Sequence, residues 1–158
     1  MEIRLRATGE VISDREFYVR SPKAPFPLTA EWLDTWGADV VLEGPQATGG
    51  TVYQYSQRDG VQEIEGKWYT KYILGPIFYD NENGTAAENE AAYKARIDAE
   101  RAKFVRDQRN NLIAETDWTQ ARDVNLANDD AYVAYRQALR DVPAQVGFPW
   151  TVEWPVKP

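Results

Sequence analysis

Short stretches of alternating apolar and polar residues mark the first part of the chain, a pattern typical of half-buried β-strands. Between Ile3 and Ala7 every second residue is apolar, and the residues between them are arginines. This pattern predicts a strand that ends at Gly9. Residues 39–42, Asp-Val-Val-Leu, predict another strand of the same small sheet.

Two capping signals predict short helices between these strands. Ser13 is followed three residues later by Glu16, which is the spacing of a capping box and predicts a helix through Phe17. Thr29 is a suitable N-cap for a second helix, which we expect to end at Gly37.

The clearest β pattern is a predicted antiparallel meander with two turn dipeptides. The turns are expected at Asp59-Gly60 and at Glu65-Gly66. The three strands are expected over residues 51–56, 61–65 and 67–74. Three strands with an apolar face are about the minimum that is stable on its own.

A single long helix is predicted at the start of the second half. Residues 86–115 contain no Gly or Pro and are rich in strong helix formers. Thr85, with Glu88 three residues later, marks the N-terminus. A helix of this length extends roughly 45 Å at 1.5 Å per residue.

The apolar stripe of this helix is thin. Its members recur at four and seven residues, which is closer to a coiled-coil seam than to the broad face of a core helix. Arg101 and Gln108 interrupt the seam. We therefore expect self-association through this stripe, with packing inside the subunit as the alternative. The stripe residues are Tyr93, Ile97, Phe104, Val105 and Leu112.

A last helix and an aromatic tail complete the chain. The helix is predicted over residues 129–142, with Arg136 and Arg140 near its end, as the helix dipole favours. Pro143 stops it. Residues 147–155 are extended and strongly aromatic, which predicts that they dock on another surface.

These elements predict an α+β protein with two domains joined at the polar stretch 80–84. Residues 1–80 form a small β-rich domain, a sheet or a sandwich with short helices. Residues 81–158 form an α-helical hairpin domain with one long helix and an extended aromatic tail.

Composition excludes most catalytic chemistry. The 158 residues include no His and no Cys, so the usual general base, thiolate nucleophiles and Cys or His metal sites are all absent. Two acidic stretches begin like calcium loops but lack the required Gly and Glu positions, and no phosphate-binding loop occurs. We therefore predict no enzyme activity, no catalytic residues, no metal and no cofactor.

Charge and hydropathy limit the partners. The formal net charge is −7, whereas nucleic-acid binding favours the opposite sign. No apolar run approaches the ~20 residues of a membrane helix, and no signal-peptide pattern follows Met1. We expect a protein that acts in a cytoplasm, with neither nucleic acid nor membrane as its partner.

Aromatic residues are the remaining candidates for function, because there are more of them than one face of a small sheet can bury. They form either a Trp-rich core or an exposed patch that binds another protein, since Tyr and Trp supply large contact areas at low entropy cost. The candidate client-binding residues are Trp32, Trp36, Tyr53, Tyr55, Trp68, Tyr69 and Tyr72.

Three blocks in the last third carry a family resemblance. They are R-N-N-L-I-A-E-T-D-W-T-Q at 109–120, Y-R-Q-A-L-R-D-V-P at 135–143, and Phe-Pro followed by Trp-Pro at 147–155. In this order they resemble the phage tail assembly chaperone domain. Ala121-Arg122 and Tyr132 depart from the family pattern, which puts the bend after Trp118 in doubt. The matching motif residues are Asp117, Trp118, Tyr135, Arg136, Pro143, Phe148 and Trp154.

The motif residues also have expected structural roles. Thr116 and Asp117 suit a helix end and a cap, so we expect Trp118 at a bend, in the core of the hairpin. Phe148, Trp150 and Trp154 either clamp the hairpin from outside or contact a client.

The resemblance implies a phage tail fibre assembly chaperone that binds the distal part of a trimeric fibre during assembly in the host cytoplasm. A stoichiometry of 3:3 would match the symmetry of the fibre, with the chaperone itself trimeric when bound. The alternative is a permanent virion subunit, such as a fibre-tip or baseplate adaptor protein.

Overall fold

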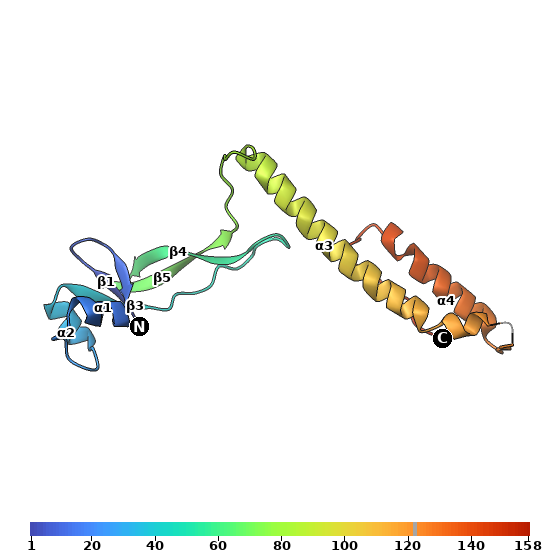
Figure 1. Cartoon of the computed structure of the whole chain (residues 1–158), viewed down its shortest axis with the longest axis horizontal. Coiled ribbons are helices and arrows are strands. Elements are labelled where there is room, and N and C mark those ends of the chain that lie inside the picture. Colours follow the sequence, from blue (N-terminus) through green and yellow to red (C-terminus); the bar gives the residue numbers. More distant parts are fainter. Residues whose placement is uncertain (122) are drawn as a thin grey trace. The chain divides into compact units, whose positions relative to one another are not determined.

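The chain forms two compact units, Met1–Ile77 and Phe78–Pro158 (Figure 1). A computed structural model describes residues 1–121 and 123–158. The first unit is a β-sheet with two short helices and the second is helical, so the predicted α+β class is confirmed. Each unit is described by itself below.

A single five-stranded sheet with the order β2-β1-β3-β5-β4 forms the first unit. The pairing of β3 with β5 is parallel, and the other three pairings are antiparallel. The strands are β1 (Glu2–Leu5), β2 (Val11–Ser13), β3 (Ala38–Leu42), β4 (Tyr55–Ile64) and β5 (Lys67–Gly75). The predicted strands at the start of the chain and at 39–42 are confirmed, whereas β2 was not predicted.

The two short helices begin where the capping signals predict. In α1 (Asp14–Arg20) the Ser13 hydroxyl accepts a hydrogen bond from the Glu16 backbone N–H, at 3.1 Å. In α2 (Ala30–Thr35) the Thr29 hydroxyl accepts one from the Trp32 N–H, at 3.2 Å. Each cap satisfies a donor that has no partner within the helix.

The core of the first unit lies between α1, α2 and one face of the sheet. Its buried members are Ile3, Ile12, Phe17, Leu33 and Ala38. Successive side chains of a strand point to opposite faces. Glu2 and Arg4 on β1 therefore lie on the face opposite to the helices.

The predicted meander is wrong in its first half. Gln54 donates its N–H to the Thr51 carbonyl oxygen, at 3.0 Å, so this segment is a turn and β4 begins only at Tyr55. The Asp59-Gly60 pair does not reverse the chain, because β4 continues through it with a register shift between Arg58 and Val61.

Strand β4 can continue through Asp59-Gly60 because a β-bulge accommodates Gly60, whose φ is +78°. The turn predicted at Glu65-Gly66 is confirmed, and both residues have positive φ. The second half of the predicted meander is thus a two-stranded hairpin.

Helix α3 (Ala86–Ala114) opens the helical part of the second unit and is 29 residues long. Thr85 and Glu88 form the complete capping box, in which each side chain bonds the backbone N–H of the other residue. Within the described residues, no helix has the length and apolar character needed to cross a membrane.

The other helices fold back on α3, as the hairpin prediction expects (Figure 1). They are the 3-10 turn η1 (Asp117–Gln120), α4 (Asp129–Asp141) and the 3-10 turn η2 (Val142–Ala144). Ala102 and Val105 on α3 are buried, as are Tyr135 and Leu139 on α4. Pro143 lies within η2, where α4 has ended.

Candidate functional site

A buried arginine connects the two helices of the hairpin. Arg136 on α4 is only 6% exposed. Its Nη1 donates to the Ile113 carbonyl oxygen and to Thr116 Oγ1, both at 2.8 Å. Its Nη2 donates to Asp117 Oδ1, also at 2.8 Å. The residues of two separate sequence blocks therefore meet at one guanidinium group.

This arrangement satisfies the end of α3, where the last carbonyl groups lack partners within the helix. Arg136 was predicted as a residue of the family motif and as a complement to the dipole of its own helix. The sequence gives no signal for its bonds to Thr116 and Asp117, because they join residues about twenty positions apart.

Trp118 lies on the surface, which corrects the prediction that it belongs to the hairpin core. It is 51% exposed and meets Tyr132 edge-on, with the ring centroids 5.9 Å apart. The buried positions of this turn belong to Thr116 and Thr119 instead. Their hydroxyl groups donate to nearby backbone carbonyl oxygens, so these small residues fill the space and the indole projects outward.

The aromatic tail docks along α3. Trp150 Nε1 donates to Asp98 Oδ1, at 2.6 Å, and Arg101 Nε donates to the Pro149 carbonyl oxygen, at 3.3 Å. The Arg106 guanidinium lies 5.1 Å from the centre of the Phe148 ring. Of the two roles expected for the tail, these contacts correspond to a clamp on the hairpin.

Further along the tail, Trp154 lines a pocket of about 310 Å³ together with three residues of α3. Those residues are Gln108, Asn111 and Leu112. The chain then returns to the connected end of the hairpin, where α3 ends and α4 begins; here Lys157 pairs with Glu115 and the Tyr132 hydroxyl donates to the Pro158 carbonyl oxygen.

The predicted self-association stripe does not face one partner. Val105 is 1% exposed and lies inside the hairpin. Tyr93 contacts Phe78, with ring centroids 5.4 Å apart, and Leu112 lines the Trp154 pocket. Ile97 is half-buried and Phe104 is half-exposed. Self-association through these residues stays a prediction.

Trp32 and Trp36 form a stacked pair in the first unit, with ring centroids 6.3 Å apart. Phe17 meets the Trp36 ring edge-on at 4.9 Å. With residues 21–24 the two tryptophans line a pocket of about 360 Å³. Trp36 is 50% exposed, so part of the pair is accessible to a partner.

The other candidate aromatics lie elsewhere in the first unit. The Arg4 guanidinium stacks over Trp68 at 3.7 Å, and the Tyr72 hydroxyl donates to Glu43 at 2.6 Å. Because Arg4 is on the sheet face opposite to the helices, Trp68 is separated from the pair on α2. Tyr53 and Tyr69 are half-buried and Tyr55 is exposed. The seven candidates thus do not form one patch.

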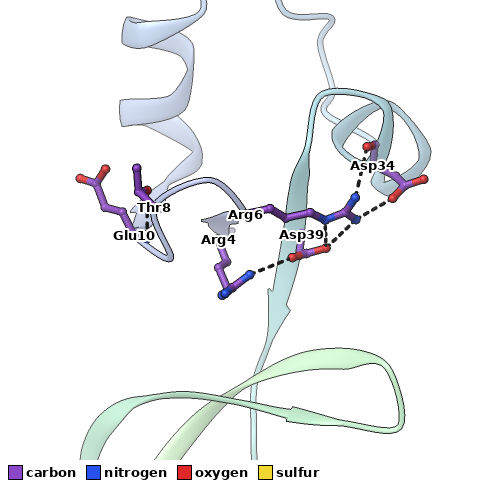
Figure 2. Close-up of polar contacts among 6 residues, drawn as sticks. All are labelled: Arg4, Arg6, Thr8, Glu10, Asp34 and Asp39. Atoms are coloured by element: carbon purple, nitrogen blue, oxygen red, sulfur yellow. Dashed lines mark hydrogen bonds and ion pairs between the residues drawn. The ribbon is translucent and has the colours of Figure 1, made fainter.

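An ionic cluster connects the end of β1 with α2 and β3 (Figure 2). Arg6 Nε donates to Asp39 Oδ1 at 2.8 Å, and Arg6 Nη2 donates to Asp34 Oδ1 at 2.6 Å. Arg4 adds a 3.4 Å contact with Asp39. Hydrogen bonds with Asp39, and then with Asp34, raise the pKa of Arg6 above its usual range.

The remaining pKa shifts also come from surface partners. A bidentate contact with Arg58 lowers the pKa of Glu2, and Arg20 does the same for Glu10. Within the part of the chain that the structure describes, no group of three acidic residues is placed to hold a metal ion. The charged clusters join structural elements together.

Comparison with protein-family models matches residues 102–158 to the phage tail assembly chaperone protein family. The matched segment contains the second part of α3, η1, α4 and the docked tail. It confirms the resemblance found over residues 109–155 and supports a non-enzymatic role as a tail assembly chaperone. No curated protein and no solved structure matches the chain.

Proposed function

We propose that this protein is a phage-encoded tail fibre assembly chaperone that binds the distal part of a trimeric fibre and assists its folding and trimerisation. The match of residues 102–158 to the tail assembly chaperone family is the observation that carries this proposal. The geometry supports the match, because Asp117 and Arg136 from separate blocks of the motif form an ion pair in the hairpin.

A fibre tip gives a chaperone a physical task. Intertwined β-rich trimers fold slowly, because long-range strand pairing must precede the contacts that stabilise it. Their unpaired strand edges are prone to wrong pairing in the meantime. A protein that covers these edges until the trimer closes prevents the wrong pairing. A 3:3 complex, with the chaperone trimeric when bound, matches the fibre symmetry.

In this proposal the first unit binds the client through its exposed aromatic side chains. Trp36 and Tyr55 are the most accessible of the seven candidates, at 50% and 54% exposure. The helical unit provides association between copies through Ile97 and Phe104. The protein acts in the host cytoplasm while the virion is assembled.

Co-expression with the tail fibre protein encoded beside this chain tests the proposal. We expect soluble, trimeric fibre when this chain is present and aggregated fibre when an unrelated acidic protein of similar size replaces it. Fibre that is equally soluble and trimeric under both conditions would refute the chaperone role.

A matched pair of variants tests the assignment of the client surface. Trp36→Ala should reduce the yield of trimeric fibre, whereas Val19→Ala, at a residue that is 74% exposed on α1, should leave it unchanged.

Mass spectrometry of purified virions distinguishes a chaperone from a permanent virion subunit. We expect this chain to be depleted, and an amount equal to that of the fibre would favour the subunit.

A further inference from the structure

The hairpin holds one tryptophan rigidly outside its own core. Trp118 lies in η1, between the buried residues Thr116 and Thr119. The neighbouring Asp117 is fixed by the buried Arg136, and the Ala121 N–H donates to the Trp118 carbonyl oxygen at 3.3 Å. The backbone on both sides of this side chain is therefore fixed, while half of the indole remains in solvent.

A fixed, exposed indole is suited to binding. Tryptophan is enriched among the residues that dominate protein interfaces. An anchor that is already ordered loses less conformational entropy when a partner binds. Tyr132 supports the edge of the indole and is itself held by its hydrogen bond to the Pro158 carbonyl oxygen. We call Trp118 and Tyr132 the tip pair.

The sequence around the tip pair is acidic. Residues 115–133 contain five carboxylates and a single cation. Two of the carboxylates, Glu115 and Asp117, have ion-pair partners within the unit. Asp123, Asp129 and Asp130 are exposed and form no ion pair with another described residue. Along the sequence, the tip pair is thus flanked by carboxylates that pair with no cation of the described residues.

We propose that the tip pair and these three aspartates form a docking surface for a Lys- or Arg-bearing segment of the tail protein that the chaperone assists. An ammonium or guanidinium group can stack on the exposed indole, the best of the aromatic rings for cation–π contacts. The aspartates favour the same charge and increase the association rate. This inference rests on the proposed function and adds a second contact surface, in the helical unit.

Binding of the purified tail fibre protein encoded beside this chain tests the surface. We expect Trp118→Ala to raise the dissociation constant of the complex about 30-fold, which is the effect of losing an interface hot spot. Tyr79→Ala is the matched control, since Tyr79 is an aromatic residue of the same unit and is 70% exposed. Its dissociation constant should stay within about 2-fold of wild type, as for a residue outside the interface.

Salt dependence tests the charge of the partner. The double variant Asp129→Asn/Asp130→Asn should bind about 5-fold more weakly than wild type at 50 mM NaCl, and the difference should fall below about 2-fold at 300 mM. Trp118→Phe keeps an aromatic ring at the same position and should retain most of the affinity. This variant separates loss of binding from loss of folding.

Three outcomes would overturn the proposal. If Trp118→Ala binds like wild type, the tip pair is not a contact surface, although the chaperone function still stands. If the sedimentation of the free protein changes in Trp118→Ala, the occupant is a second copy of this chain. If wild-type protein neither binds the fibre nor improves its assembly, the proposed function fails together with the docking surface.

Discussion

Replacing Arg136 with Ala tests whether the buried guanidinium holds the hairpin together. The change removes three hydrogen bonds of the guanidinium group, to the Ile113 carbonyl oxygen, Thr116 Oγ1 and Asp117 Oδ1. The Ile113 carbonyl oxygen keeps the Thr116 N–H and hydroxyl as donors, so the cost is that of losing hydrogen bonds to a charged group, about 1.5–3 kcal/mol. The Asp117 carboxylate is 64% exposed and regains water, so the full cost of breaking a buried ion pair does not apply.

The lost packing contacts of the buried Arg136 side chain add to this cost. We therefore expect the free energy of unfolding of the helical unit to fall by about 2–4 kcal/mol. Urea unfolding of the full chain, followed by circular dichroism at 222 nm, reports mainly on this unit, because it holds the long helices. Arg136→Lys should recover only part of the loss, since an ammonium group lacks the planar arrangement of donors.

Arg140→Ala is the matched control, because Arg140 lies one helical turn later and is exposed. Its effect should stay within about 0.5 kcal/mol. If Arg136→Ala shifts the unfolding transition no more than Arg140→Ala does, the buried network does not stabilise the hairpin, and our explanation of the sequence motif is wrong.

Three further changes have defined outcomes. Ile97→Glu with Phe104→Glu should break self-association in sedimentation experiments, and an unchanged mass would show that the stripe contacts no second copy. Gly44→Ala should lower the melting temperature, since the added Cβ would overlap a backbone carbonyl oxygen of β5; an unchanged value would contradict this close approach. Hydrogen bonds from the Thr85 N–H and hydroxyl hold the pKa of Glu88 below its usual value of 4.5, so its contribution to stability is present above about pH 4.5 and is lost as the pH falls through the lowered pKa. Glu88→Gln should remove this part of the acid dependence in thermal melts, and an identical dependence in both proteins would contradict the assignment.

Local signals in the sequence predicted the helices well. The caps at Ser13, Thr29 and Thr85 begin the three helices that they predict, because each cap bonds to a backbone group only three residues away. The long run of helix-forming residues after Thr85 predicted α3, because helix propensity is also a local property of each residue. The Glu65-Gly66 turn also depends only on neighbouring residues.

The β4 strand shows where local signals were insufficient. Asp59-Gly60 is a strong hairpin signal, but pairing with β5 continues on both sides of it and turns the glycine into part of a bulge. The strand that was expected to begin at Thr51 begins at Tyr55, since the preceding residues form a turn. Pairing with the neighbouring strand β5 decided the first case, whereas hydrogen bonds between Thr51 and Gln54 decided the second.

Residue types and short spacings were enough to predict the α+β composition, the long capped helix and the resemblance of the last third to a known family. The tertiary structure decided which side chains are buried. It placed Arg136 beneath the end of α3 and turned Trp118 toward solvent. Burial depends on which distant segments meet, and neither hydropathy nor spacing within one segment specifies those contacts.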